Sequence, residues 1–224
     1  MRTPILIINM KNYTEVSGDQ AVRLAKAAEE VAGELSVEIA VAPPLPSLGQ
    51  VVQAVSIPVL AQHTDPAKEG STTGAIVPEM VKALGAAGSL VNHSEKRLPF
   101  EVIGETVHRL KGIGLTAVVC AKTSDEVAQI TGLGPDFVAI EPPELIGSGI
   151  AVSKAQPEIV SRAVEAARKV DHSVRVICGA GIVTGEDVAS ALKLGSVGVL
   201  VASGIVKAVD WQDKIRELAL PLQG

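Results

Sequence analysis

The chain has 224 residues, and 47% of them are hydrophobic, so it is long and apolar enough to bury a large core. Aromatic residues make up only 2%, and that core must therefore be built from aliphatic side chains. The net charge is −5, and lysine and arginine are scattered without forming a basic stripe, which argues against nucleic acid and anionic membranes as partners.

Apolar runs of strand composition alternate with helical patterns along the whole chain. In order, the expected strands are residues 5–9, 37–42, 57–61, 89–92, 115–120, 137–140, 174–178 and 197–201. The expected helices are residues 19–35, 48–55, 78–84, 100–113, 124–130, 156–170, 184–194 and 210–220. Several of the strands are continuously apolar, as parallel strands covered on both faces are.

These units continue without a break in composition, which predicts one α/β domain over residues 1–224. We expect a single (β/α)8 barrel, with eight parallel strands inside and helices outside. A doubly wound open sheet is the alternative, because a local pattern does not show whether a sheet closes. In a barrel, the functional residues lie in the loops that follow the strands.

Glu141 follows the apolar run 137–140 and precedes Pro142 and Pro143. A residue before proline is restricted to extended geometry, so Glu141 should continue the strand and project from its end. The prolines make the following segment stiff, whereas glycines in the segment 147–149 leave its far end free to move. Taken alone, this pattern fits an ordinary solvated glutamate better, but together with the rest of the chain it favours a catalytic base under a closing loop.

His93 follows the fourth expected strand and precedes Ser94, a residue suited to cap a short helix over residues 95–97. The positive end of such a helix would keep the imidazole neutral and able to donate a hydrogen bond to a polarised carbonyl oxygen. For the remaining histidines a structural role is expected; these are His63, His108 and His172.

Gly179 and Gly181 follow the seventh expected strand, as in the start of a dinucleotide fingerprint. The third glycine would fall at Thr184, and no acidic residue ends the next strand, so NAD binding is rejected. Backbone N–H groups after the seventh and eighth strands of a barrel commonly bind phosphate. We expect a phosphate group here.

Other chemistries have weaker support. The two cysteines and four histidines lack metal-ligand spacing, so neither a metal ion nor a cofactor is expected. A glycosidase pair of Glu95 and Glu141 is disfavoured, because Lys96 and Arg97 favour an ion-paired Glu95. An aldolase would need a buried lysine, for which Lys122 is the candidate. A barrel that binds a sugar phosphate without catalysis is a further alternative.

Cys120 and Cys178 both end apolar runs, which favours free thiols in a reducing compartment. The first residues do not form a signal-peptide pattern, and no apolar run approaches the roughly 18 residues that span a bilayer. A cytoplasmic location without a membrane partner is expected. The segment 62–76 exceeds the usual connection of roughly 4 to 6 residues, and its tip, residues 70–74, could reach a neighbouring subunit.

Several motifs taken together resemble those of triosephosphate isomerases, in that family's order and at the matching strand ends. They are Asn9-x-Lys11, Asn92-His93-Ser94-Glu95-Lys96-Arg97, Ala139-Ile140-Glu141-Pro142 and Ile146-Gly147-Ser148-Gly149. The resemblance covers the whole chain and implies a TIM barrel that acts on triose phosphates in glycolysis and gluconeogenesis. The short chain and its few aromatic residues are similar to compact archaeal members, which implies a homo-oligomer, a tetramer built from dimers.

The resemblance also implies residue roles. Glu141 would move a proton between the two carbons of dihydroxyacetone phosphate and glyceraldehyde 3-phosphate, and His93 would polarise the carbonyl. Lys11, oriented by Asn9, would supply positive charge, with Glu95 behind it. The implied substrate contacts beyond these are Ile146, Gly147, Gly181, Ala202 and Ser203.

Thr73 would reach the partner's active site. The chain departs from the family at Asn92, where glycine is usual, and at Ala202-Ser203, where paired glycines are usual. It also has Ile140 in place of an aromatic residue and Pro143-Glu144 in place of Val-Trp. These departures bear on the lid and on phosphate geometry more than on the reaction.

Overall fold

The computed structural model describes residues 1–142 and 156–223. Its strands are β1 (Ile5–Asn9), β2 (Glu38–Ala42), β3 (Leu60–Ala61), β4 (Gly88–Val91), β5 (Thr116–Ala121), β6 (Phe137–Ile140), β7 (Arg175–Cys178) and β8 (Gly198–Val201). They form one eight-stranded parallel sheet in the order β2-β1-β8-β7-β6-β5-β4-β3. The two edges meet, because Val41 of β2 bridges Val59 and its N–H donates to the Pro58 carbonyl at 3.0 Å. The predicted barrel is confirmed, and the open sheet was the wrong alternative.

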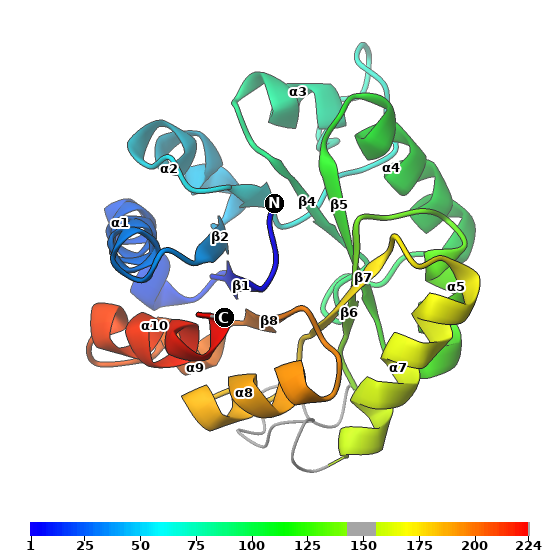
Figure 1. The fold of residues 1–224 in the computed structure, drawn as a ribbon. Helices are drawn as coiled ribbons and strands as arrows, with labels where there is room; N and C mark the ends of the chain where they lie inside the picture. Colours follow the sequence, from blue (N-terminus) through cyan, green and yellow to red (C-terminus); the bar gives the residue numbers. More distant parts are fainter. Residues whose placement is uncertain (143–155, 224) are drawn as a thin grey trace.

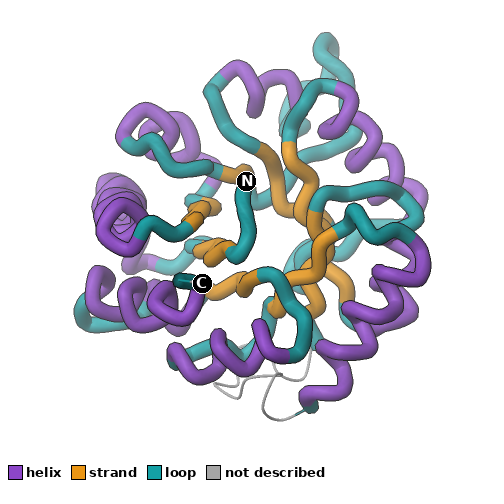
Figure 2. The backbone as a smooth tube through the Cα atoms, in the orientation of Figure 1, coloured by secondary structure: helices purple, strands orange, loops and turns teal. Residues whose placement is uncertain are grey.

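The helices lie on the outside of the strands (Figures 1 and 2). They are α1 (Asp19–Leu35), α2 (Leu48–Ala54), α3 (Pro78–Ala83), α4 (Phe100–Gly112), α5 (Ser124–Thr131), α7 (Pro157–Val170), α8 (Gly185–Lys193), α9 (Ser203–Val206) and α10 (Trp211–Ala219). Short 3-10 turns are η1 (Thr14–Val16), η2 (Leu45–Ser47) and η4 (Leu220–Leu222). The eight longer predicted helices are present with ends that agree to within one residue, whereas the short α9 was not predicted.

Two predicted strands differ from the structure. The third was expected over residues 57–61, but β3 has only two residues, since Pro58 has no N–H with which to pair. The fourth was expected to include Asn92, which instead turns out of the strand with φ of 61°. Both differences lie next to the residues that form the pocket.

Alternate strand residues fill the inside of the barrel, and this alternation positions the site. Ile5 and Ile7 of β1 belong to the buried inner cluster, and Asn9 is the next residue in the same alternation. In β6, Ala139 lies in that cluster and Glu141 follows two residues later. Polar side chains that continue the inward period therefore meet at the carboxyl-terminal rim.

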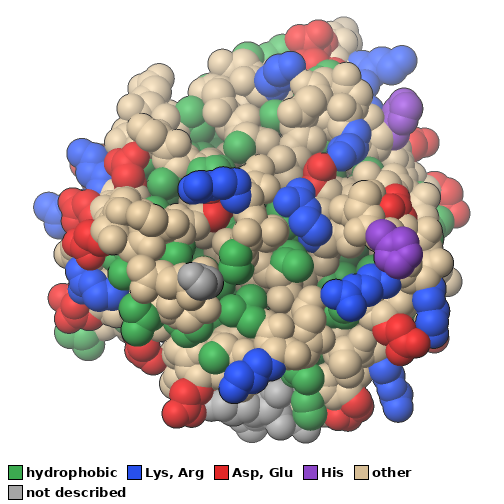
Figure 3. All heavy atoms as spheres, viewed as in Figure 1, with side chains coloured by type: hydrophobic (Ala, Val, Ile, Leu, Met, Phe, Trp, Pro, Cys, Tyr) green, Lys and Arg blue, Asp and Glu red, His purple; other side chains and the backbone are tan. Residues whose placement is uncertain are grey.

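The chain begins over the opposite rim (Figure 1). The Met1 carbonyl accepts a hydrogen bond from Nη1 of Arg175, the first residue of β7, and that guanidinium stacks 3.9 Å from the Phe137 ring centroid. Acidic and basic side chains are interspersed on this face (Figure 3). Within the described ranges, no helix combines the length and apolarity that a membrane crossing needs.

The segment 62–76 leaves the barrel between β3 and α3 and projects beyond the body of the molecule (cyan in Figure 1). Asp65 closes its neck: the Asp65 N–H donates to the Ile76 carbonyl at 2.9 Å, and the carboxylate accepts from the Ile76 N–H at 2.7 Å. The other carboxylate oxygen lies 3.0 Å from Nε2 of the buried His63. The base of the loop is thus fixed, while Thr73 at its tip is exposed.

Candidate active site

Glu141 lies at the carboxyl end of β6 and is only 3% exposed. Its N–H donates to the Ala121 carbonyl at 2.8 Å, which extends the β5–β6 ladder by one residue, as the proline after Glu141 predicted. Burial raises the pKa of its carboxyl group to about 7, against the opposing effects of the Cys120 thiol and the Lys11 charge. Oε2 has no hydrogen-bond partner among the described residues. A buried carboxylate with this pKa is suited to accept a proton near neutral pH.

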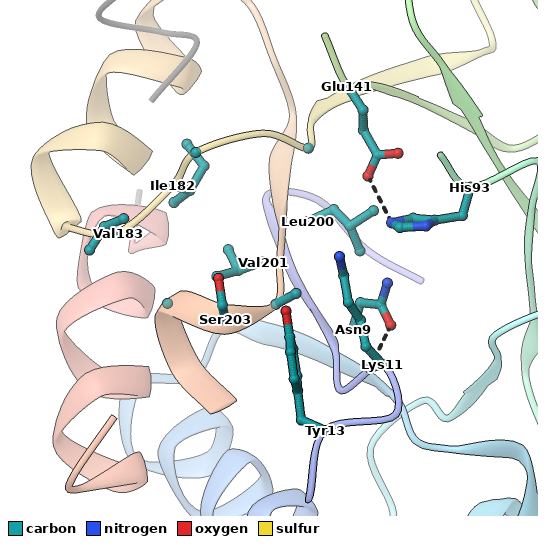
Figure 4. Close-up of a pocket in the computed structure, with 14 residues that line it drawn as sticks. Asn9, Lys11, Tyr13, His93, Glu141, Ile182, Val183, Leu200, Val201 and Ser203 are labelled. Atoms are coloured by element: carbon teal, nitrogen blue, oxygen red, sulfur yellow. Dashed lines mark hydrogen bonds and ion pairs between the residues drawn. The ribbon is translucent and has the colours of Figure 1, made fainter. Parts of the chain in front are cut away.

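His93 faces Glu141 across the pocket, with Nε2 3.6 Å from the Glu141 Oε1 atom (Figure 4). The Glu95 backbone N–H donates to Nδ1 at 3.2 Å, so a neutral ring carries its proton on Nε2. Burial lowers the pKa of His93 to about 4, the Lys11 charge lowers it further, and Glu95 acts in the opposite direction. The imidazole is therefore neutral and presents an N–H to the cavity.

The helix expected after His93 is absent, and that part of the sequence analysis was wrong. Residues 93–96 form a turn closed by a hydrogen bond of 2.8 Å from the Lys96 N–H to the His93 carbonyl. The predicted neutral state of the imidazole is present, but burial and the neighbouring cations lower the pKa of His93, not a helix dipole.

Asn92 shapes the turn from which His93 projects. Its φ of 61° is left-handed, a conformation that asparagine adopts more readily than most residues. Asn92 Nδ2 donates to the Cys120 carbonyl and its Oδ1 accepts from the Leu98 N–H, both at 2.9 Å. Cys120 lies one residue past the last β4–β5 pair, so the side-chain amide occupies the next rung of the ladder. The backbone can then turn without leaving that carbonyl unpaired.

Lys11 supplies the cation of the site. It follows β1 with φ of 49°, and its N–H donates to Asn9 Oδ1 at 3.0 Å. Gln62 Nε2 donates to the Lys11 carbonyl at 2.9 Å, and Lys11 Nζ pairs with Glu95 Oε1 at 2.9 Å. The largely buried ammonium is thereby held in the pocket wall. Glu95 is ion-paired as expected, but with Lys11 and not with the adjacent Lys96 or Arg97 on which the expectation rested.

The pocket runs from these side chains to the loops after β7 and β8 (Figure 4). Gly181 there has a left-handed φ of 72°, whereas Ala202 has φ of −123°, a value open to any residue. The alanine that replaces a glycine of the family pattern therefore needs no positive φ, although its ψ of −94° lies outside the usual helical and extended ranges. Gly204 lets α9 pack closely, because a Cβ at that position would lie 2.8 Å from the Ile182 carbonyl oxygen.

Comparison with known proteins agrees with this geometry. The sequence profile of triosephosphate isomerases matches residues 4–218. The chain belongs to the triosephosphate isomerase family. A triosephosphate isomerase of Caldivirga maquilingensis is 50% identical over 224 residues, covering 100% of both chains. One of Methanothermus fervidus is 49% identical over 218 residues, or 97% of this chain and 98% of the relative, and one of Archaeoglobus fulgidus is 51% identical over 214 residues, or 96% of each.

Several expected residues of the triosephosphate isomerase pattern come together in the structure. Those on the pocket wall are Asn9, Lys11, His93, Glu141, Gly181, Ala202 and Ser203. Glu95 lies behind Lys11, and Thr73 lies on the projecting loop. Ile146 and Gly147 fall outside the described residues, as do Pro143 and Glu144 of the expected lid.

The sequence analysis placed Gly179 only in the expected phosphate turn and interpreted Cys120 only as a free thiol, yet both shape the space around Glu141. The Cys120 thiol is fully buried inside the barrel, where burial and the Glu141 charge raise its pKa well above the ordinary value. A Cβ on Gly179 would lie 2.5 Å from Glu141 Cγ. The available signal was the alternation of inward-facing residues along β5 and β7. That alternation does not show which residues of neighbouring strands lie side by side.

The structure also bears on the alternative chemistries. Lys122 is exposed, which is unsuitable for a Schiff-base lysine that needs a lowered pKa. Thr184, the expected third glycine of a dinucleotide fingerprint, caps α8 through reciprocal hydrogen bonds with Asp187. Across residues 1–142 and 156–223, no group of three or more His, Cys, Asp or Glu side chains is arranged to hold a metal ion.

Proposed function

We propose that this chain interconverts dihydroxyacetone phosphate and D-glyceraldehyde 3-phosphate, the triosephosphate isomerase reaction of glycolysis and gluconeogenesis. Membership of the family supports this assignment. The observation that carries it for this chain is the pair formed by Glu141 and His93: a buried carboxyl group of raised pKa faces a neutral imidazole across 3.6 Å. Such a pair can remove a proton from carbon while it polarises the adjacent carbonyl.

In the proposed reaction, the Glu141 carboxylate takes a proton from the carbon next to the substrate carbonyl. As that C–H bond breaks, its electrons form the carbon–carbon double bond of an enediolate, whose oxygen receives a hydrogen bond or proton from His93 Nε2. Glu141 then returns its proton to the other carbon, and His93 moves protons between the two oxygens. The fixed Lys11 ammonium would stabilise the negative charge as it develops.

The phosphate group would lie at the other end of the pocket. Gly181, Ala202 and Ser203 would contribute backbone N–H groups there, together with Ile146 and Gly147 on the lid. The left-handed Gly181 and the close packing of Gly204 against Ile182 support this placement, because they bring the backbones of two loops to the same end of the cavity.

Assembly is a further part of the proposal. The loop 62–76 would insert Thr73 beside the active site of a second copy, and dimers would combine into a tetramer. The projection of the loop and its fixed neck at Asp65 support this, since a preformed arm loses little conformational entropy on docking. A cytoplasmic location is proposed from the glycolytic reaction and from the free thiol of Cys120.

The proposed reaction is tested by supplying D-glyceraldehyde 3-phosphate in deuterated water and coupling dihydroxyacetone phosphate to a reductase. Isomerisation predicts rapid product formation, with solvent deuterium incorporated at the substrate carbon. A barrel that only binds sugar phosphates would give neither product nor exchange. An aldolase would be trapped covalently on a lysine by borohydride in the presence of substrate, and that result would overturn the proposal.

A further inference from the structure

Tyr13 lies on the pocket wall two residues beyond Lys11, in the loop after β1. In Figure 4 its ring extends from this loop into the pocket, and in this view the hydroxyl group ends nearer to Ser203 than to Glu141 or His93. It thus lines the end of the cavity at which the loops after β7 and β8 meet. Neither the sequence motifs nor the proposed mechanism gives this side chain a role.

The surroundings of Tyr13 hold its ring in place. It directly precedes η1, and the N–H of the fully buried Val16 donates to the Tyr13 carbonyl at 3.2 Å. The ring packs against the outer core, and the ammonium of Lys207 lies 4.9 Å from its centroid. Lys207 directly follows α9, so this cation–π contact joins the first and the last loops of the barrel.

The hydroxyl group itself is available for a ligand. It makes no hydrogen bond to any residue in the ranges 1–142 and 156–223, although the backbone that carries it is fixed. A phenol donates well to an anionic oxygen, and the other donors proposed at this end of the pocket are backbone N–H groups. The positive charge of Lys207 on the ring face also makes this end of the site favourable for an anion.

We propose that the Tyr13 hydroxyl donates a hydrogen bond to the substrate phosphate and so contributes to selection of phosphorylated over unphosphorylated trioses. This inference rests on the proposed isomerase function, because that function places the phosphate at this end of the pocket. Tyr13 would act in binding only, since its hydroxyl lies apart from the Glu141–His93 pair in Figure 4.

The test is Tyr13→Phe, which keeps the ring and removes only the hydroxyl. Two substrates are compared, D-glyceraldehyde 3-phosphate and unphosphorylated glyceraldehyde, and inorganic phosphate is measured as a competitive inhibitor. A hydrogen bond to a charged group corresponds to roughly tenfold or more in affinity. We expect kcat/KM for the phosphorylated substrate to fall about tenfold, the inhibition constant of phosphate to rise by a similar factor, and kcat/KM for glyceraldehyde to stay unchanged.

Thr14→Val is the matched control, because it removes an exposed hydroxyl from the adjacent residue, outside the wall of this pocket. It should leave all three quantities unchanged. Equal losses on both substrates in Tyr13→Phe would show a structural role and overturn the inference, as would no loss on either. An inactive wild-type enzyme would refute the proposed function instead, and calorimetric binding of inorganic phosphate to both forms would still test Tyr13 separately.

Discussion

His93 Nε2 lies 3.6 Å from Glu141 Oε1, and the order of the two pKa values is the reverse of that of the free side chains. Burial lowers the pKa of His93 from 6.5 to about 4 and raises the pKa of Glu141 from 4.5 to about 7. The carboxyl group therefore holds a proton more tightly than the imidazole does. The pair is thus no salt bridge near neutral pH: the imidazole stays neutral whether or not Glu141 is ionised.

The first prediction concerns pH. In the proposed reaction only the ionised Glu141 accepts the carbon proton, so kcat/KM should fall as the pH is lowered through about 7. Because kcat/KM reports groups of the free enzyme, its acidic limb should have a midpoint near that value. Rate measurements with D-glyceraldehyde 3-phosphate over a range of pH test this. An acidic limb near the ordinary value of 4.5 would show that burial does not raise the pKa of Glu141.

The second prediction concerns the protonation of His93. With a pKa of about 4, its imidazole should stay neutral at every pH above about 5, with the proton on Nε2. Nitrogen NMR of labelled histidine should show no titration of this residue between pH 5 and 8. Titration of His93 near 6.5 would contradict a neutral electrophile.

Glu141→Asp is the third. The shorter side chain withdraws the carboxylate by one methylene group, and a misplacement of about 1 Å can cost on the order of 10²-fold in rate. The loss should fall on kcat, with little change in the inhibition constant of a phosphate-bearing analogue. Activity within about threefold of wild type would mean that another group removes the carbon proton.

A fourth prediction follows from Gly179. In Gly179→Ala, the new Cβ would lie 2.5 Å from Glu141 Cγ, so the carboxylate must move aside. A displacement of about 1 Å predicts a loss of up to on the order of 10²-fold in kcat. Gly112→Ala is the control, because it adds the same methyl group on α4 with no atom within 4 Å. If the folded Gly179→Ala variant keeps wild-type turnover, the position of Glu141 does not depend on the absence of a side chain at Gly179.

The fifth separates the two contributions of Asn92. Asn92→Gly keeps easy access to the left-handed φ but removes two hydrogen bonds, and should lower the free energy of unfolding by roughly 1–3 kcal/mol. Asn92→Ala loses the same bonds and adds about 1 kcal/mol of backbone strain. Urea unfolding of the three proteins gives the comparison. Equal stability of the alanine and glycine variants would show that the φ of 61° is not a constraint in solution.

The sequence predicted much of this site because its central residues stand where a strand ends. Asn9 and Glu141 continue an inward alternation that can be read along one strand, and His93 and Lys11 lie within two residues of one. Cys120 and Gly179 could not be assigned in this way. Their contact with Glu141 depends on the register between neighbouring strands, which no local pattern contains.

The position of Tyr13 could not be predicted from the sequence for a related reason. Its contact with Lys207 exists only because β1 and β8 pair when the sheet closes, and local periodicity does not show closure. The length of β3 was predicted wrongly and α9 was not predicted, since two and four residues are too few to establish a period.

The closure of the barrel has a consequence for how the molecule loses activity. The seam between β2 and β3 is narrow: β3 has two residues, and one bridge joins Val41 to Val59. Gln62 spans this seam with hydrogen bonds to the Lys11 and Ala42 carbonyls at 2.9 and 3.1 Å. Lys11 follows β1, which pairs with β2 on one side of the seam. His93 follows β4, which pairs with β3 on the other side. A local opening there would part the cation from the imidazole while β8 to β4 stayed paired, so warming should inactivate the enzyme before the barrel melts as a whole.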